Sequence, residues 1–471
     1  MKLAIVGGGP SAFYVAARLL SRSADPALRV HVFDRLWAPH GLVRYGVAPD
    51  HPEVKNCTHK FDTVASDSRF RFFGNVNVGA PPPPAFAHAL HLPLSTLHSH
   101  YSHLLFATGC TLPAHHSALA NAPWCIPALS FVHWYTKHPA APPPPPLHLL
   151  DHVSLIGNGN VALDVARILL APLSRLEKYD IPGSVLTALA ASTVRHVSII
   201  ARRGPLQAAF TAKELRELTS LPDTSMKPLD PALLEVPPGE IPTRQQARVL
   251  QLLAQGSRER YGHTPRSWSL EFFRAPLGIE PASAPDAGAM LSLAPTVLDS
   301  EGRAVRIPDA PSEKLRTSLV ITSLGFRGEP DAPYFDQEMG HLRARAGRVI
   351  GADARPVKGV YASGWAAMGA RGVLATTMMD AYGVADVMLA DADSTASEST
   401  ADGEQLMNPA PTDDAPPAMV QAGLAAGRVV EYADWQRIDA EEVRRGEALG
   451  KERERMGWAE ADAVLRTAKG Q

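Results

Sequence analysis

The chain has 471 residues, of which 45% are hydrophobic and 20% charged, as in a globular protein of two or three domains. Its 46 Lys and Arg against 48 Asp and Glu give a formal net charge of −2, which argues against a protein whose main partner is nucleic acid. The three cysteines include no Cys-x-x-Cys pair, so a disulfide framework and a dithiol relay are excluded. No apolar run reaches the roughly 20 residues that span a bilayer.

Alternating strands and helices are predicted from the first residues onward. Because strand-like residues begin at Lys2, no room is left before them for a targeting peptide. The protein is therefore either cytoplasmic or has a presequence that lies upstream or was removed. A parallel sheet with helices on both faces is predicted from strands at Leu3–Val6, Arg29–Phe33 and Leu104–Thr108 and a helix at Ser11–Leu20.

The same strand, glycine turn and helix recur about 150 residues later. A strand is predicted at His152–Ile156, a helix at Asn160–Leu170 and a further strand at Arg195–Ile200. Proline-rich stretches at Pro81–Pro84 and Pro142–Pro146 are typical of stiff connectors. Residues 391–418 are poor in large apolar side chains and are predicted to be a disordered insertion, followed by a charged helical tail.

The first glycine turn indicates a dinucleotide site. Gly7 permits the tight turn, Gly9 lets a pyrophosphate approach the helix N-terminus, and Ala12 permits close packing of helix on strand. Ser11 opens the same helix. Asp34 ends the next strand, about 25 residues beyond Gly9, which suits an acid that holds a ribose hydroxyl. A 2′-hydroxyl dinucleotide, FAD or NAD, is therefore expected here.

The second glycine turn has the opposite charge at its specificity position. The turn is formed by Gly157–Ala162, which includes Asn158, Gly159, Asn160 and Val161, and the next strand ends at Arg202 and Arg203. Paired guanidinium groups bind a 2′-phosphate by charge-assisted hydrogen bonds, whereas a carboxylate would repel it. The second site is therefore predicted to bind NADP.

Two dinucleotide sites in one chain limit the chemistry. One cofactor passes hydride to the other, and a flavin can release its two electrons singly. Without a cysteine pair, the electrons must leave for a one-electron carrier, oxygen or a quinone.

Six motifs, spread over nearly the whole chain, resemble the adrenodoxin reductase family, the mitochondrial-type NADPH–ferredoxin reductases. The matching stretches are GLVRYGVAPDHPEVKN at Gly41–Asn56, GNVNVG at Gly74–Gly79, GNGNVALDVARILL at Gly157–Leu170, RRGPLQAAFTAKELREL at Arg202–Leu218, SGWAAMGARGVLATTMMDA at Ser363–Ala381 and DWQRIDAEEVRRGEALGKERERM at Asp434–Met456. The resemblance implies an α/β fold with two Rossmann-like domains. An NADP domain, residues 110–335, is inserted into a discontinuous FAD domain, residues 1–109 and 336–471.

The resemblance also implies cofactor contacts and a reaction. FAD would contact Ala12, Asp34, Leu42, Val78, Trp365, Gly372, Val373 and Leu374, and NADP would contact Asn158, Gly159, Asn160, Val161, Arg202, Arg203, Glu214 and Gly372. The implied enzyme takes hydride from NADPH and passes single electrons to a [2Fe–2S] ferredoxin of the adrenodoxin type. Hydride transfer between stacked rings needs no general acid or base, so no catalytic residue is assigned, although Asp164 is a candidate helper. The resemblance also implies a mitochondrial location, in the matrix or at the periphery of the inner membrane.

An acidic ferredoxin needs a basic docking face even on a chain of low net charge. Arg244 and Arg248 are four residues apart and so share one face of a predicted helix, with Arg258 and Arg260 beyond it. The family places ferredoxin-binding arginines in this region. An ordinary solvated helix face is the alternative reading of these arginines.

No metal site is expected. The clustered His88, His91, His98, His100 and His103 have no evident Cys or carboxylate companion and are interpreted as surface residues of a low-complexity insertion. Cys57 and Cys110 are expected in the core.

Two other functions remain open from the sequence. One is an FAD- and NADPH-dependent monooxygenase or oxidase that passes electrons to oxygen, and the other is a subunit that binds FAD only for structure. Oxygen-dependent consumption of NADPH would favour the first, and absence of flavin reduction by NADPH would favour the second.

Overall fold

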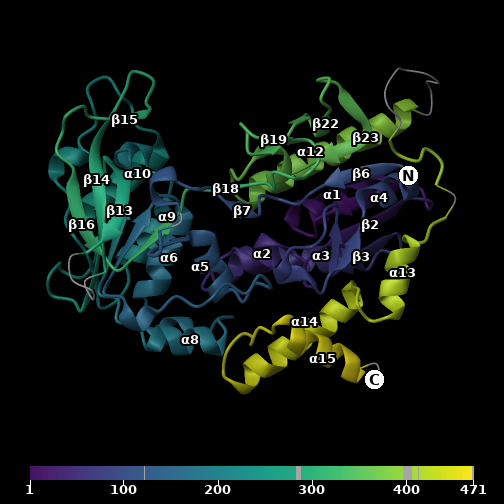
Figure 1. Ribbon diagram of the computed structural model, residues 1–471, viewed down its shortest axis with the longest axis horizontal. Coiled ribbons are helices and arrows are strands. Elements are labelled where there is room, and N and C mark those ends of the chain that lie inside the picture. Colours follow the sequence, from purple (N-terminus) through teal and green to yellow (C-terminus); the bar gives the residue numbers. More distant parts are fainter. Residues whose placement is uncertain (121, 283–287, 396–405, 412, 469–471) are drawn as a thin grey trace. The chain divides into compact units, whose positions relative to one another are not determined.

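The computed structural model describes residues 1–120, 122–282, 288–395, 406–411 and 413–468. The chain forms two compact units (Figure 1). Unit 1 comprises Met1–Leu112, Thr136–Ala141 and Phe326–Gln471, and unit 2 comprises Pro113–Tyr135 and Pro142–Gly325. The chain of unit 2 therefore interrupts that of unit 1. Among the described residues, no helix combines the length and apolar character that crossing a bilayer requires.

Unit 1 is built on an eight-stranded sheet in the order β21-β22-β23-β6-β1-β2-β3-β24. The central pairs β23–β6, β6–β1, β1–β2 and β2–β3 are parallel, and the outer pairs are antiparallel. All five residues of β1 are buried, and after Lys2 they are all apolar, as expected for a parallel strand covered on both faces. The strands are β1 (Lys2–Val6), β2 (Arg29–Asp34), β3 (Phe70–Gly74), β6 (His103–Phe106), β21 (Ala344–Arg345), β22 (Arg348–Ile350), β23 (Pro356–Ala362) and β24 (Val430–Glu431).

Helix α1 follows β1 directly and packs against the long helix α12. Pro10 stands in the first turn of α1, where its missing N–H and fixed φ suit a helix start. The helices of unit 1 are α1 (Pro10–Arg22), α2 (Leu42–Tyr45), α3 (Thr58–Ala65), α4 (Leu94–His100), α11 (Trp365–Met368), α12 (Leu374–Thr395), α13 (Ala418–Ala425), α14 (Tyr432–Ala448) and α15 (Trp458–Ala468). Smaller elements are the 3₁₀ helices η1 (Pro52–Cys57) and η2 (Pro84–Phe86) and the strands β4 (Val76–Val78), β5 (Leu90–Leu92), β18 (Phe326–Arg327), β19 (Phe335–Asp336) and β20 (His341–Leu342).

Unit 2 repeats the design with a fully parallel six-stranded sheet, in the order β11-β12-β10-β9-β17-β8. Its strands are β8 (Cys125–Pro127), β9 (His152–Ile156), β10 (His196–Ile200), β11 (Thr224–Met226), β12 (Arg266–Glu271) and β17 (Leu319–Thr322). Its helices are α5 (Ala128–Tyr135), α6 (Asn160–Leu170), α7 (Leu173–Leu176), α8 (Gly183–Ala190), α9 (Ala212–Thr219) and α10 (Arg244–Gln255), with 3₁₀ turns η3 (Ser117–Leu119), η4 (Leu147–Leu149), η5 (Pro205–Gln207) and η6 (Pro231–Leu234). The short strand β7 (Leu112–Pro113) stands where the chain leaves unit 1.

A second, antiparallel sheet in unit 2 is formed by β13 (Arg274–Pro281), β14 (Ala289–Leu298), β15 (Ala304–Arg306) and β16 (Glu313–Thr317). Strand β14 is its centre and pairs with the other three. Leu291 and Leu293 of β14 join Ile200 of β10 and Leu119 of η3 in one buried apolar cluster. The predicted fold class, an α/β protein with Rossmann-like units, is confirmed.

Residues 391–418, which the sequence predicts to be a disordered insertion, make specific contacts in the part that the structure describes. Asp391 lies in α12 and pairs with Arg348 at 2.6 Å, and Met407 is 2% exposed. The ammonium group of Lys2 donates to the carbonyl oxygens of Asp413 and Ala415 at 2.6 and 2.8 Å. Composition missed this order because a single buried Met and a few backbone hydrogen bonds suffice to hold a polar segment. Residues 396–405 and 412 lie outside the described residues.

The histidine-rich segment is ordered rather than a low-complexity surface insertion. It contains η2, β5 and α4. His88 is half-buried, stacks on Trp458 with 5.1 Å between ring centroids, and shares a hydrogen bond with Asn75. His91 shares a hydrogen bond with the Gly79 carbonyl oxygen. Of the two cysteines expected in the core, Cys110 is buried and Cys57 is half-buried.

Candidate functional site

The first glycine turn connects β1 to α1 in unit 1. Gly7 has φ +102°, and a Cβ there would lie 2.5 Å from the Ala107 carbonyl oxygen, so only glycine fits. Gly9 stands at the N-cap of α1, and a Cβ on it would meet no atom within 4 Å. Gly41, with φ +48°, approaches Gly9 so closely that its own Cβ would lie 3.0 Å from the Gly9 Cα. The turn therefore leaves bare backbone beside a helix N-terminus, which suits a pyrophosphate.

The second glycine turn has the same geometry in unit 2. Gly157 has φ +119°, and a Cβ there would overlap the Ser323 carbonyl oxygen. Gly159 is the N-cap of α6, and a Cβ on it would meet nothing within 4 Å. The side-chain amide nitrogen of Asn158, Nδ2, is buried and has no hydrogen-bond partner among the described residues. An unpaired buried donor beside an open helix N-terminus fits a phosphate-bearing ligand.

Asp34, the last residue of β2, contacts the first turn directly. Its carboxylate accepts hydrogen bonds from the backbone N–H of Gly8 at 2.6 Å and of Leu36 at 2.8 Å. Burial raises the pKa of Asp34 to about 6, although these two N–H groups and Arg35 lower it. Because a carboxylate offers about four acceptor positions, Asp34 can still accept a ribose hydroxyl while it braces the turn.

The other residues predicted to contact FAD lie around the first turn and at the start of α12. Ala12 and Ser11 are buried on α1, and the Ser11 hydroxyl is 2.6 Å from that of Ser363. Leu42 opens α2, and Val78 ends β4. Ser11 therefore joins α1 to the end of β23 rather than facing solvent.

Trp365 and Gly372 flank the turn that leads into α12. The Trp365 indole donates from Nε1 to the Arg371 carbonyl oxygen at 3.0 Å, and its ring stacks on Phe326 with 5.8 Å between centroids. Gly372 has φ +81°, and Val373, just before the first residue of α12, Leu374, is 56% exposed. A large apolar side chain left exposed at the N-terminal end of a 22-residue helix suits contact with a flat aromatic ligand.

Arg202 and Arg203 lie just beyond β10, at the position that Asp34 occupies in unit 1. Arg202 is exposed and Arg203 is half-buried. Neither guanidinium forms an ion pair with any residue that the structure describes. Two uncompensated cations at this strand end favour an anionic group such as a 2′-phosphate.

Asn160, Asp164 and Glu214 are held by contacts within unit 2. The Asn160 side chain accepts from the Thr211 N–H at 2.8 Å, and Thr211 in turn caps α9. Arg167, 2% exposed, pairs with Asp164 at 2.8 Å and with Glu214 at 3.1 Å. Val161 follows Asn160 in α6 and packs against the apolar core of the unit.

Sequence reasoning missed two residues that position the predicted site. Asp380 of α12 accepts from the Gly364 N–H at 2.6 Å and from the Ser363 hydroxyl at 3.0 Å, which holds the turn before Trp365. Arg167 orients Glu214. The spacing of Asp164 and Arg167 in α6 was the available signal for the second, because residues three apart on a helix can pair.

The predicted docking arginines lie on one exposed stretch of unit 2. Helix α10 begins with a capping box formed by Thr243 and Gln246 and contains no acidic residue. Arg244, Arg248, Arg258 and Arg260 are all exposed, and none forms an ion pair with a described residue. We call these four residues, two on α10 and two in the segment that follows it, the α10 basic face.

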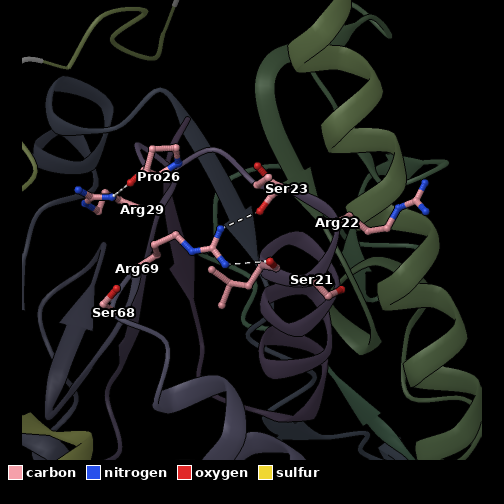
Figure 2. Close-up of a pocket in the computed structure, with 9 residues that line it drawn as sticks. Ser21, Arg22, Ser23, Pro26, Arg29, Ser68 and Arg69 are labelled. Atoms are coloured by element: carbon pink, nitrogen blue, oxygen red, sulfur yellow. Dashed lines mark hydrogen bonds between the residues drawn. The ribbon is translucent and has the colours of Figure 1, made fainter.

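A surface pocket of about 750 Å³ in unit 1 is not part of this site (Figure 2). It lies where α1 ends and β2 begins, at the amino end of β2, whereas the glycine turn lies at the carboxyl end of β1. Arg69 donates to the carbonyl oxygens of Ser23 and Leu20 and pairs with Asp67, and Arg29 donates to Pro26 and pairs with Asp414. Because these guanidinium groups are already bound, the pocket offers little to an anionic cofactor.

Comparisons with known proteins agree with this geometry. A family described as FAD-NAD(P)-binding matches residues 4–58, which include the first glycine turn and Asp34. NADPH:adrenodoxin oxidoreductases of Bos taurus and Homo sapiens, both mitochondrial, are 36% identical over 97% of this chain and 90% of their own. The NADPH-ferredoxin reductase FprA of Mycobacterium tuberculosis is 34% identical over 96% of each chain. The structure of FprA in complex with NADPH superposes with a TM-score of 0.81 at 34% identity and covers 98% of this chain and 99% of that one.

Two glycine turns, one followed by an acid and one by two arginines, define a two-dinucleotide oxidoreductase. The near full-length identity then narrows the class. The chain belongs to the family of NADPH:adrenodoxin oxidoreductases and NADPH–ferredoxin reductases, which has mitochondrial and bacterial members.

Proposed function

We propose that this chain is an FAD-dependent NADPH:ferredoxin oxidoreductase, which takes hydride from NADPH and passes electrons one at a time to a [2Fe–2S] ferredoxin of the adrenodoxin type. The observation that carries the proposal is the 36% identity over 97% of the chain to enzymes named for this reaction. The charge difference between Asp34 and the Arg202–Arg203 pair supports it independently.

Unit 1 is proposed to hold FAD, and unit 2 to hold NADP. The FAD domain predicted from the sequence, residues 1–109 with 336–471, and the predicted NADP domain, residues 110–335, differ from these units only in that unit 1 also includes residues 110–112, 136–141 and 326–335. FAD supplies the change from two-electron to one-electron transfer. The backbone at Gly9 and the N-terminus of α1 bind the pyrophosphate, and Asp34 accepts a ribose hydroxyl. The amides that begin α12, beside Gly372 and Val373, stabilise negative charge on the ring system.

In unit 2, the chain's residues bind and orient the nicotinamide nucleotide. The N-terminus of α6 at Gly159 receives the pyrophosphate, and the Asn158 amide nitrogen is a donor in need of an acceptor. Arg202 and Arg203 bind the 2′-phosphate. Arg167 pairs with Glu214 and with Asp164 and holds both carboxylates in place, so Asp164 is assigned a positioning role.

The reaction is tested by stopped-flow reduction of the oxidised protein with NADPH without oxygen, followed by addition of a [2Fe–2S] ferredoxin. We expect the flavin absorbance to bleach and then to return as the ferredoxin is reduced. A reduced flavin that the ferredoxin does not reoxidise, and that only oxygen reoxidises, would instead identify an oxidase or monooxygenase. Flavin that NADPH does not bleach would leave only a structural role for FAD.

The α10 basic face is proposed to bind the ferredoxin. Replacing Arg244 and Arg248 by Glu should raise the KM for ferredoxin roughly tenfold, because two attractive charges become repulsive. Ferricyanide reduction, which needs no docking, should remain unchanged, and added salt should weaken the wild-type interaction.

The matched control for docking reverses two exposed charges elsewhere in unit 2, Arg175→Glu with Lys178→Glu on and beside α7. An equal rise in KM for this control would show that net charge matters and that α10 does not. Equal loss of ferredoxin and ferricyanide reduction in the α10 variant would indicate a damaged cofactor site.

The compartment is proposed to be the mitochondrion, on the strength of the mitochondrial relatives. Identity alone does not separate the compartments, because the bacterial relative is 34% identical. Imaging of the chain with a fluorescent C-terminal tag in its own cell would decide, and diffuse cytoplasmic signal would refute the proposal.

A further inference from the structure

Two neighbouring arginines of unit 2 and a third one about a hundred residues later have one property in common. Arg202, Arg203 and Arg306 form no ion pair with any residue in the described part of the chain. Elsewhere in this unit, Arg274 and Arg316, which lie on β13 and β16 of the antiparallel sheet, pair with Glu313 and Asp151 at 2.7 Å. Arg202, Arg203 and Arg306 therefore each have a guanidinium group that can bind an anion.

The antiparallel sheet brings Arg306 to Arg202. The Thr296 hydroxyl of β14 donates to the Arg202 carbonyl oxygen at 2.8 Å. Thr296 and Arg306 are direct partners in the antiparallel pair of β14 and β15. Side chains of directly opposed residues leave an antiparallel pair on the same face. Because the Thr296 side chain faces Arg202, the Arg306 side chain leaves β15 on that same face.

His116 adds a neutral donor to the group. It caps η3, where its Nδ1 accepts from the Ala118 N–H at 3.3 Å, so the proton of the neutral ring is on Nε2. Leu119, at the end of η3, is packed against Leu291 and Leu293 of β14, which fixes the turn on the sheet. Ile200, two residues before Arg202, belongs to the same buried cluster as Leu119. Burial and, after it, the charges of Arg306 and Arg202 hold the pKa of His116 below its usual range, which agrees with this placement of η3.

We propose that Arg306 and His116 complete, with Arg202 and Arg203, a single site for the 2′-phosphate of NADP(H). This proposal rests on the proposed binding of NADP by unit 2 and adds two specificity residues to it. Arg306 supplies a third guanidinium, and His116 supplies one N–H donor from Nε2. A dianionic phosphate has enough acceptor oxygens for all of these groups. The antiparallel sheet thereby contributes to cofactor choice, in addition to the strand end that follows the glycine turn.

The test uses calorimetric titration of the full chain with 2′,5′-ADP and with 5′-AMP, which differ only in the 2′-phosphate. Arg306→Gln is expected to weaken binding of 2′,5′-ADP about fivefold, because Arg306 is exposed and its contact is partly screened. His116→Asn is expected to weaken it about threefold, since Asn keeps the capping acceptor but is too short to replace Nε2. Binding of 5′-AMP should not change in either variant.

Arg303→Gln is the matched control. Arg303 lies in the turn before β15, but its guanidinium already pairs with Asp299 and Glu301 at 2.9 and 3.1 Å. Its loss should leave 2′,5′-ADP binding unchanged. Weakening equal to that of Arg306→Gln would show a general charge effect and overturn the proposal.

The double variant Arg202→Ala with Arg203→Ala separates this inference from the proposed cofactor assignment. If it weakens 2′,5′-ADP binding while Arg306→Gln and His116→Asn do not, the enlarged site is wrong and the NADP assignment stands. If none of these variants weakens binding of 2′,5′-ADP, unit 2 does not recognise the 2′-phosphate, and both proposals fail together.

Discussion

Replacing Arg202 and Arg203 by alanine is expected to lower the preference for NADPH over NADH about a hundredfold, measured as the ratio of the two kcat/KM values. Each guanidinium is expected to contribute about 1.5 kcal/mol through a charge-assisted hydrogen bond to the 2′-phosphate, and about 3 kcal/mol corresponds to roughly two decades. NADH has no such phosphate, so its kcat/KM should change little. The variant should therefore lose activity with NADPH without losing the ability to transfer hydride.

The control for this variant is Arg195→Ala, at the other end of the same strand. Arg195 is exposed and forms no ion pair with a described residue. It adjoins the amino end of β10, away from the glycine turn that follows β9. An unchanged NADPH to NADH ratio in the Arg202/Arg203 variant would contradict the 2′-phosphate assignment. A parallel fall in both kcat/KM values would indicate a misplaced loop instead.

Removing the carboxylate of Glu442 is expected to destabilise unit 1 by about 3–5 kcal/mol, because the change leaves Arg44 buried without its counter-ion. Arg44 is 7% exposed and pairs with Glu442, which is fully buried, at 2.7 Å. Burial alone would lower the pKa of Arg44, but the Glu442 carboxylate more than offsets it, so the guanidinium stays charged. Glu442 also accepts from the Met456 N–H at 2.8 Å, which ties the chain after α14 to this pair.

The measurement is urea unfolding of Glu442→Ala beside Glu441→Ala. Glu441 is the preceding residue of α14 but pairs near the surface with Arg444 and Arg445, so its loss should cost less than about 1 kcal/mol. Because Arg44 lies in α2, which starts at Leu42, we also expect weaker FAD retention by Glu442→Ala. Equal unfolding midpoints for the two variants would show that the buried pair contributes nothing specific.

The candidate site was predictable wherever a short stretch of sequence carries its own geometry. Gly7 and Gly157 follow buried strands and open helices, and the structure gives both a positive φ and a close carbonyl neighbour. The acid at Asp34 and the arginines at Arg202 and Arg203 could be assigned because parallel β-α-β units place the next strand end beside the turn. Their roles as cofactor contacts remain predictions.

Prediction failed where order depends on a few distant contacts. The composition around Met407 predicts disorder, yet the described residues there are anchored by one buried side chain and by Lys2, some four hundred residues earlier in the chain. The histidine-rich stretch was read as a surface insertion, but stacking of His88 on Trp458 joins it to the far C-terminal helix. Neither contact has a local sequence signal.

The two dinucleotide turns, the opposite charges that follow them and the resemblance to a family can all be recognised from the amino-acid sequence alone. These features are local, since a buried strand, a glycine and a helix start are written within about a dozen residues. The proposed addition of Arg306 and His116 to the site of Arg202 depends on the tertiary structure. These residues lie about a hundred and about ninety residues from Arg202 in the chain, and they are placed by the pairing of β14 with β15 and by the packing of η3 on β14. Strand pairing at such separation depends on the whole fold, so no local pattern could predict it.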